Sequence, residues 1–485
     1  MNAAARIIDW PADPADALPL ALWSAEAIAE AVDGVASADF QCSGVEIDSR
    51  DVLPGDLFFA LKGESMDGHR FVEAAFEKGA SAVVVDRPVD GPHVLVKDTT
   101  LALQMLARAA RGRGEPLVVG VTGSVGKTGV KEAIFAALDR SSRGAAHRSV
   151  KSYNNHVGVP LSLARMPARA RFGIFEMGMN HAGEIAALTR QVHPHVAVIT
   201  TIAPAHIEML GSEEAIADAK AEIFEGLVPG GVAVIPADTP YFERLKAKAE
   251  HHAVRVVSFG KAVHADVRLL DAVAAPGGGS LVTIDMGDRR LCYTVSAPGE
   301  HWIVNSLAVM ATVRAVKGDL GAAGLALAEM EGLKGRGERL EIPVGEGTTL
   351  VIDESYNANP ASMRATLAQL GATPARRRIA VLGAMKELGD FAPGFHAALA
   401  GPIAEANVDF ALLVGDEMGA LADELGKSAG GALGKAFRFA HCRNAAEARI
   451  LLAEFGVESG DAILVKGSNS VGLGALVAAL AGKEG

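Results

Sequence analysis

The chain has 485 residues, of which 49% are hydrophobic, and a formal net charge of −12 at pH 7. This length suggests roughly three domains of about 100–200 residues each, with enough apolar residues for a core in every one. The acidic balance argues against a general surface for nucleic acid or anionic membranes, since both need a basic face. A local basic pocket for an anionic small molecule is compatible with this net charge.

The three cysteines, Cys42, Cys292 and Cys442, lie far apart in the chain. An odd, scattered set suits a reducing compartment and argues against a disulfide framework or a cysteine-type zinc site. The start of the chain lacks the basic-then-apolar layout of a signal peptide, and no uninterrupted apolar run approaches the ~18 residues of a membrane span. We therefore expect a cytoplasmic protein without membrane insertion.

The first segment, residues 1–112, contains short strand-like runs. VEIDSRDVLPGDLFFALKG predicts a strand, a turn at residues 54–56 and a second strand, and FVEAAFEKGASAVVVD predicts a helix followed by a buried strand. These elements indicate a small α/β unit.

The pattern changes scale in residues 113–334. The apolar runs LVVGV, FGIFEM, VAVITTI and GVAVIP are separated by helical segments, which is typical of a mostly parallel sheet with crossover connections. A hairpin-like signal follows near Gly277–Gly279, and HWIVNSLAVMATVRAV then predicts a long amphipathic helix. A second α/β pattern occupies residues 335–485, with strands at TLVIDES, RRIAVLGAM, FALLVG and DAILVKGS.

The segment VVGVTGSVGKT, residues 118–128, connects an apolar strand to a helix through glycines. Such a turn aims backbone N–H groups and the positive helix end at one point, which suits a phosphate. Lys127 would reach the terminal phosphates of a nucleotide, and the Thr128 hydroxyl would bind Mg²⁺. The usual spacing of such a phosphate-binding turn has a glycine at the position of Val121. The alternative interpretation of the segment is an ordinary strand–helix turn. We expect ATP to bind here, at Thr122, Gly123, Ser124, Val125, Gly126, Lys127 and Thr128.

Two polar residues follow strands predicted to end at the same edge of the sheet. Glu176 closes FGIFEM, and its carboxylate would join Thr128 at a Mg²⁺ ion, which prefers oxygen ligands. His206 comes just after VITTI, where it would contact a ligand or metal. The alternatives are a solvated glutamate and a structural histidine.

Lys220 stands on the apolar side of a helix predicted for SEEAIADAKAEIFEGL, which Ser212 can cap. The apolar stripe that contains it consists of Ile216, Lys220, Ile223, Phe224 and Leu227. A lysine there must snorkel, pair or lose its proton, because burial lowers the pKa of an ammonium. A neutral amine reacts with CO₂ to give a carbamate that can hold a second Mg²⁺. The pattern alone favours snorkelling.

Polar residues near the start of the third segment extend the candidate site. The amide of Asn305 can read an adenine edge, although a solvated helix position explains it equally well. Arg339 follows the glycine-rich linker 332–337 and would reach the ATP phosphates. DESYNANP, residues 353–360, groups carboxylates, a phenol and amides at one strand end, and Lys466 begins either an anion cradle or a simple turn.

Taken together, nine motifs resemble the Mur ligase family. They are DSRDVLPGDLFFALKGESMDGHRF, GVTGSVGKT, SYNNHVGVPLSL, FEMGMNHAGEI, APAHIEMLGS, AKAEIF, DESYNANPASM, GAMKELGDFAPGFH and VKGSNS. They run from the first segment to the last, so the resemblance covers nearly the whole chain. GAMKELG favours the branch that adds D-alanyl-D-alanine, and the Asp-Asn-Pro-Arg motif of the branch that adds meso-diaminopimelate is absent.

The resemblance implies an α/β protein of three domains. Residues 1–112 would hold the UDP end of the substrate, residues 113–334 would form a central P-loop ATPase with a mostly parallel sheet, and residues 335–485 a Rossmann-like domain. It further implies ATP and Mg²⁺ as cofactors, an N-carboxylated Lys220, and a monomer that binds no nucleic acid.

The resemblance also assigns roles to single residues. The implied catalytic residues are Lys127, Lys220 and His206, and the implied metal ligands are Thr128, Glu176, Lys220 and His206. Further ATP contacts are Asn305, Arg339 and Glu354. The implied substrate-binding residues are Ser49, Arg50, Lys62, His69, Asn154, Asn155, His156, Tyr356, Asn357 and Asn359.

Two positions depart from the family pattern. Asp353 and Glu354 stand where many relatives have paired aspartates, which leaves open the carboxylate that faces the ribose. Asn469 stands where the family pattern has arginine, which weakens an acceptor-binding role for that loop.

The implied reaction joins D-alanyl-D-alanine to UDP-N-acetylmuramoyl-tripeptide, a step of peptidoglycan precursor synthesis. A carboxylate oxygen would attack the γ-phosphate of ATP, and the dipeptide amine would then attack the acyl phosphate. Closure of the third domain would protect that intermediate from water. The alternatives are another amide ligase of the superfamily, such as a diaminopimelate-adding or folylpolyglutamate synthase-like enzyme, a P-loop NTPase switch, and an inactive paralogue.

Overall fold

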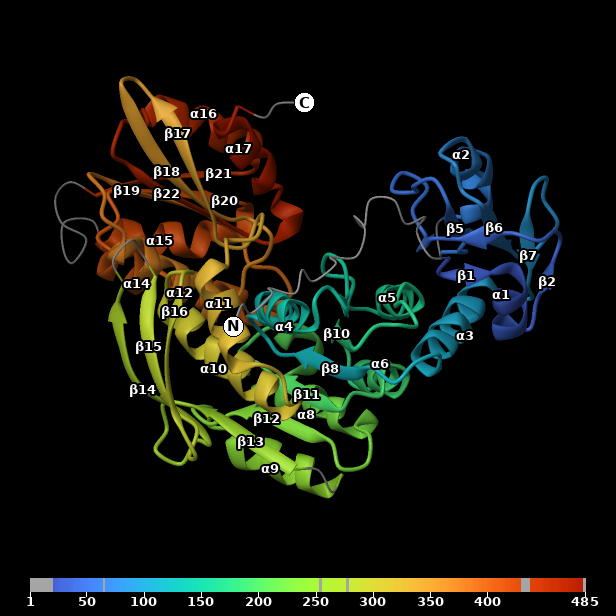
Figure 1. Cartoon of the computed structure of the whole chain (residues 1–485). Coiled ribbons are helices and arrows are strands. Elements are labelled where there is room, and N and C mark those ends of the chain that lie inside the picture. The colour runs from blue at the N-terminus through green and yellow to red at the C-terminus, as the bar shows by residue number, and fades with distance from the viewer. Residues whose placement is uncertain (1–20, 64–65, 253–254, 276–278, 429–436, 483–485) are drawn as a thin grey trace, which may run out of the picture. The chain divides into compact units, whose positions relative to one another are not determined.

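The computed structural model describes residues 21–63, 66–252, 255–275, 279–428 and 437–482 (Figure 1). These ranges leave out Glu64–Ser65 of the first family motif, Gly277–Gly278 of the glycine run, and residues 1–20 at the start of the chain. Two compact units are present, one formed by residues up to 115 together with 157–170, the other by 116–156 together with 171–485. Among the described helices, none has the length and apolar character needed to cross a membrane.

The first unit is built on a five-stranded sheet with the order β2-β7-β6-β5-β4. Its strands are β2 (Val35–Ala36), β4 (Gly44–Glu46), β5 (Asp56–Phe59), β6 (Ala82–Val85) and β7 (His93–Leu95). All neighbours are parallel except β2 and β7. A separate antiparallel pair is formed by β1 (Trp23–Ser24) and β3 (Gln41–Cys42).

Helices cover this sheet, and the strands β5 and β6, which are apolar apart from Asp56, are buried along their whole length, as expected for parallel strands. The helices are α1 (Ala25–Val32), the 3₁₀ turn η2 (Gly68–Phe71), α2 (Val72–Glu77), α3 (Thr99–Gly112) and α5 (Gly158–Ala164). Helix α5 comes from the middle of the chain and packs against α3.

The second unit contains a nine-stranded sheet with the order β16-β15-β14-β13-β12-β11-β8-β10-β9. The strands are β8 (Leu117–Thr122), β9 (Ala146–Arg148), β10 (Phe172–Glu176), β11 (Val196–Ile199), β12 (Val232–Pro236), β13 (Arg255–Gly260), β14 (Val267–Ala274), β15 (Ser280–Asp285) and β16 (Arg290–Val295). Neighbours from β9 to β14 are parallel, and β14, β15 and β16 form an antiparallel meander. The predicted strands and crossovers are therefore present.

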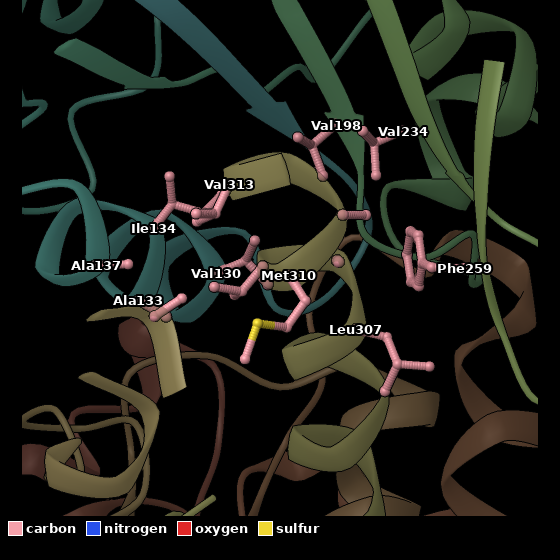
Figure 2. Packing of buried hydrophobic residues seen from close by; sticks show 14 of the residues in the cluster. Val130, Ala133, Ile134, Ala137, Val198, Val234, Phe259, Leu307, Met310 and Val313 are labelled. Atoms are coloured by element: carbon pink, nitrogen blue, oxygen red, sulfur yellow. The ribbon is translucent and has the colours of Figure 1, made fainter. Parts of the chain in front are cut away.

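The helices of this region are α4 (Lys127–Ser142), α6 (Glu184–Val192), α7 (Ile207–Leu210), α8 (Glu213–Ala221), the 3₁₀ turn η3 (Glu222–Gly226), α9 (Phe242–His251), α10 (Glu300–Ala315) and α11 (Leu320–Glu329). Helix α4 buries Val130, Ala133, Ile134, Ala137 and Leu138, which recur at helical spacing. Figure 2 shows this face of α4 beside Met310 and Val313 of α10. The same α10 packs against β12, β13 and β14, so the core fixes the helix that begins at the glycine turn.

A six-stranded sheet with the order β17-β18-β22-β19-β20-β21 forms the rest of the second unit. The strands are β17 (Glu338–Val344), β18 (Gly347–Glu354), β19 (Arg378–Gly383), β20 (Phe410–Val414), β21 (Arg438–Cys442) and β22 (Ala462–Lys466). Only the β17–β18 pair is antiparallel among these described strands.

The helices around this sheet are α12 (Pro360–Ala372), η4 (Gly389–Phe391), α13 (Ala392–Ala397), α14 (Ala400–Glu405), η5 (Asp416–Met418), α15 (Gly419–Ser428), α16 (Ala445–Phe455), η6 (Asn469–Val471) and α17 (Leu473–Leu480). The prediction of an α/β protein with mostly parallel sheets in several domains is confirmed. The limits 1–112, 113–334 and 335–485 stay predictions.

Candidate nucleotide site

The glycine turn between β8 and α4 requires its glycines. Gly123 has φ 144°, and a Cβ there would lie 2.0 Å from the Thr200 hydroxyl oxygen. Gly126 has φ 86°, and a Cβ there would lie 3.0 Å from the amide nitrogen of Asn305. No described side chain caps the start of α4. The N–H groups of its first turn, which the helix cannot satisfy internally, therefore suit an anionic ligand.

Thr128 and Glu176 meet at the carboxyl ends of β8 and β10, as predicted. The Thr128 hydroxyl donates to Glu176 Oε2 at 2.9 Å, and the Asn154 amide donates to Glu176 Oε1 at 2.8 Å. Glu176 is buried. Carboxylate and hydroxyl oxygens suit Mg²⁺, although no group of three or more His, Cys, Asp or Glu side chains in the described residues forms a ready metal cluster.

Lys127 folds back over the turn, where its ammonium donates to the Gly123 carbonyl at 2.7 Å. Burial lowers the pKa of Lys127, and the nearby Arg336 adds to that effect while Glu176 opposes it. An ammonium held at the turn by one carbonyl is placed where a phosphate would meet it.

A cavity of about 360 Å³ opens beside the turn and is lined by residues of both sheets of the second unit. The predicted site residues among its lining are Ser124, Val125, Gly126, Lys127, Asn154, Asn155, Glu176, His206, Asn305, Glu354, Tyr356, Asn357 and Asn359. Gly123 and Thr128 belong to the adjoining turn. The exposed His156 is not part of the lining.

The turn also contains the hydroxyls of Ser124 and Thr122, of which only the first has a hydrogen-bond partner among the described residues. The Ser124 hydroxyl donates to the Ala203 carbonyl at 2.8 Å, which fixes the turn to the loop after β11. The Thr122 hydroxyl is buried and has no partner within the described part of the chain.

Lys220 is only 2% exposed, so the snorkelling that the sequence pattern favoured does not occur. Ser212 caps α8 as predicted, and the apolar neighbours Ile216 and Ile223 are fully buried. Burial holds the pKa of Lys220 well below its usual range, and the charge of Lys127 lowers it further. In the described residues nothing pairs with or hydrogen-bonds the Lys220 amine. Lys220 is not part of the cavity lining.

His206 lines the cavity, and its Nδ1 lies 2.6 Å from the Glu387 carboxylate. Glu387 belongs to GAMKELG, a motif that indicated the family but no role for this glutamate.

Arg336, a linker residue without a predicted role, lines the first cavity. Its guanidinium donates to the Ser152 hydroxyl at 3.1 Å and lies 4.1 Å above the Tyr356 ring. Arg339 lines a second cavity of about 430 Å³, which shares Arg336, Trp302, His301 and Glu354 with the first. Arg339 is absent from the lining of the first cavity.

The geometry separates the roles of the paired carboxylates that the sequence left open. Asp353 is buried and accepts from the backbone N–H groups of Gly335 and Ser355, both at 3.0 Å, so it holds the linker. Glu354 lines both cavities and pairs with Lys466 at 3.3 Å. Burial lowers the pKa of Lys466, and Glu354 opposes this shift.

The rest of DESYNANP is partly structural. Lys466 donates to the Asn357 carbonyl at 2.9 Å. The Asn359 side chain accepts from the Ser362 backbone N–H at 2.9 Å and caps α12, while Pro360 occupies its first turn. Asn359 is therefore a helix cap that borders the cavity, and its contact with the substrate stays a prediction. Asn469 is exposed and outside the lining.

Four of the predicted substrate-binding residues belong to the first unit, where they differ in exposure and in their partners. Arg50 is highly exposed and pairs with Asp48 at 2.7 Å, Lys62 is exposed, and Ser49 is half-buried. The His69 ring is buried, with Nδ1 2.7 Å from Asp67 Oδ1 and Nε2 accepting from the Asp86 backbone N–H at 3.1 Å. Both ring nitrogens are engaged inside the unit, so the structure does not support the expected substrate contact of His69.

A buried lysine on α4 is a further residue that sequence analysis missed. The Lys131 ammonium is fully buried and donates to the carbonyls of Ser149 and Lys151 at 3.0 and 2.9 Å. It thereby holds the segment that carries Ser152 and Asn154 against the helix of the glycine turn. Its place among Val130 and Ile134 on α4 was a readable signal.

Comparison with known proteins gives matches along the chain. The family descriptions "Mur ligase family, catalytic domain", "Mur ligase middle domain" and "Mur ligase, glutamate ligase domain" match residues 41–111, 121–313 and 335–469. The UDP-N-acetylmuramoyl-tripeptide--D-alanyl-D-alanine ligase of Synechocystis sp. is 35% identical over 92% of this chain and 93% of the relative.

Two solved structures resemble the fold. MurF from Acinetobacter baumannii has a TM-score of 0.81 at 30% identity, covering 96% of this chain and 100% of that one. MurF ligase from Thermotoga maritima in complex with ADP has a TM-score of 0.73 at 26% identity, covering 91% and 97%.

Proposed function

Since the chain belongs to the Mur ligase family, we propose that it joins D-alanyl-D-alanine to the C-terminal carboxylate of UDP-N-acetylmuramoyl-tripeptide. The products would be UDP-N-acetylmuramoyl-pentapeptide, ADP and phosphate, a step of peptidoglycan precursor synthesis. The observation that carries this proposal is the meeting of the glycine turn, the Thr128–Glu176 pair and Arg336 around one cavity.

ATP fits the turn as the energy-supplying substrate of this ATP-dependent family. The uncapped start of α4 offers N–H groups, and Lys127 and Arg336 bring two cations to the cavity wall. Thr128 and Glu176 would hold Mg²⁺ through oxygen atoms, as that ion requires. Bound Mg²⁺ would neutralise charge on the phosphates.

The chemical problem is to make an amide from a carboxylate, which is a poor acyl donor. A carboxylate oxygen of the tripeptide attacks the γ-phosphorus of ATP, the bond to the β-phosphate oxygen breaks, and an acyl phosphate and ADP result. Lys127 and Arg336 balance the negative charge that spreads over the transferred group, and such electrostatics dominate phosphoryl transfer. The dipeptide amine then attacks the acyl carbon, and phosphate leaves with the formation of the amide.

Lys220 is proposed to be N-carboxylated in the active enzyme. The residue is buried, and burial favours the neutral amine that reacts with CO₂. The carbamate would give the wall of the site two anionic oxygens and so a place for a second Mg²⁺, with His206 as the other proposed ligand.

The remaining assignments are proposals of the same kind. Residues 1–112 would bind the uridine end of the substrate, 113–334 would bind ATP, and 335–485 would bring Arg336 and Glu354 to the site. The enzyme would work as a monomer in the cytoplasm. Asn305, which lies against Gly126 on the cavity wall, supports a role beside the nucleotide.

The test is a product assay with purified protein, ATP, Mg²⁺ and UDP-N-acetylmuramoyl-tripeptide, with and without D-alanyl-D-alanine, read by mass spectrometry. We expect pentapeptide and stoichiometric phosphate only when both acceptor and donor are present. Meso-diaminopimelate and L-glutamate serve as control acceptors. Phosphate release at the same rate with and without the dipeptide would instead indicate an NTPase switch. Ligation of a control acceptor would indicate another amide ligase.

A further inference from the structure

Two segments far apart in the sequence meet at the edge of the cavity. The loop after β11 contributes His206, the following helix α7 contributes Glu208, and the loop after β19 contributes Glu387. His206 Nδ1 lies 2.6 Å from Glu387 Oε2, and the Glu208 backbone N–H donates to the Glu387 carbonyl at 3.3 Å. Main chain and side chains thus both join the two loops.

Both ends of this contact have backbone conformations that ordinary residues seldom adopt. His206 has φ 62° and Glu387 has φ 65°, in the left-handed region that favours glycine. Such residues persist where the surroundings hold them, and they are concentrated at functional sites. The neighbouring Gly389, at φ 51°, packs closely on Glu208, since a Cβ there would lie 3.0 Å from the Glu208 side chain.

The contact places a carboxylate oxygen next to a ring nitrogen. Nδ1 of His206 is shielded from water, and the Glu387 oxygen approaches it at close range but out of line with a regular hydrogen bond. The short contact places a carboxylate acceptor beside Nδ1.

We propose that Glu387 is a positioning residue for His206: its carboxylate keeps the imidazole proton on Nδ1 and leaves Nε2 as the nitrogen that acts toward the cavity. The inference extends the proposed function, on which the role of the cavity rests. A carboxylate behind a functional histidine commonly fixes the ring tautomer and orientation. Because Glu387 belongs to the third predicted domain, His206 is set correctly only when its loop and the GAMKELG loop are in contact.

An adjacent ion pair supplies a matched control. Lys386 pairs with Glu417, and the Lys386 backbone N–H donates to the Ser468 hydroxyl at 3.0 Å. Lys386 belongs to the same loop as Glu387, Glu417 lies on η5, and neither glutamate is part of the cavity lining. Glu417→Gln removes the ion partner of this loop and leaves the His206–Glu387 contact in place.

The direct test is ¹⁵N NMR of histidine-labelled, ligand-free protein at pH 8, where imidazole is neutral. Long-range proton–nitrogen correlations report the nitrogen that carries the proton, and His206→Gln assigns the signal. We expect the proton on Nδ1 in the wild type, in Glu387→Gln and in Glu417→Gln, and on Nε2 in Glu387→Ala. A wild-type proton on Nε2, or no change in Glu387→Ala, overturns the inference whatever the ligase assay shows.

The kinetic test uses the same variants in the ligation assay. We expect kcat to fall about tenfold or more in Glu387→Ala, the size typical of lost support behind a functional histidine. Because Gln still offers an acceptor oxygen, Glu387→Gln should stay within about threefold of the wild type, with KM for ATP little changed in both. Equal losses in Glu387→Ala and Glu417→Gln would show a merely structural role for the loop and would contradict the proposal. Absence of ligation in the wild type would count against the proposed function alone, since the NMR result is independent of it.

Discussion

Lys220→Met is expected to make the protein more stable and inactive. The whole Lys220 residue is 2% exposed, and burial together with the charge of Lys127 lowers the pKa of its amine. Holding a polar group in such surroundings costs about 1–3 kcal/mol by mutational data. Methionine has a similar length and no polar head, so the free energy of unfolding should rise by about that amount. Ligation should be lost together with the proposed carbamate.

The assay is urea unfolding in CO₂-depleted buffer, with the exposed Lys248 as control. Lys248→Met should stay within about 0.5 kcal/mol of the wild type, since surface pairs contribute little. The change of this stability difference with pH also has a predicted direction. The folded pKa of Lys220 lies well below 10.5, so between the two values the unfolded chain binds more protons and wild-type stability rises with pH. The advantage of Lys220→Met should therefore shrink as the pH approaches 10.5. A variant destabilised by more than about 1 kcal/mol would refute the reasoning, since the amine would then have a partner.

Three other predictions follow from single contacts. Lys131→Met removes the donor from the carbonyls of Ser149 and Lys151 and the ion partner of Glu132, and should cost about 2–4 kcal/mol in urea unfolding. Arg140→Met on the same helix breaks an exposed pair and should cost less than about 0.5 kcal/mol; equal losses would contradict the role of Lys131. Arg336→Ala should raise KM for ATP about tenfold without loss of folding, and an unchanged KM would count against its place in the site. The exposed Cys292 should react with a thiol reagent about a thousandfold faster than Cys42, whose pKa burial raises to about 12; comparable rates in the folded protein would contradict that burial.

The local features of the site could be predicted from the sequence because adjacent residues carry them. A glycine turn between an apolar strand and a helix specifies its own geometry, and parallel strands bring Glu176 to the same edge as Thr128. Helical spacing indicated the apolar face that contains Lys220, but spacing alone cannot show whether a long side chain escapes to solvent. The covering elements decide that question.

Other features depend on contacts between distant segments, which no local pattern contains. Arg336 was overlooked because a short glycine-rich linker has no periodicity to orient its side chains. The partnership of His206 with Glu387 requires two loops that are 181 positions apart in the chain to meet. One miss was avoidable, since Asn359 followed by Pro360 and Ser362 is a readable helix-capping pattern.

The proposed function depends on ATP at the glycine turn activating the tripeptide carboxylate by phosphorylating it. The most direct test is ligation with UDP-N-acetylmuramoyl-tripeptide whose terminal carboxylate carries ¹⁸O. Attack of a carboxylate oxygen on the γ-phosphorus predicts one ¹⁸O in the phosphate released at each turnover. Amide formation with wholly unlabelled phosphate would contradict the claim.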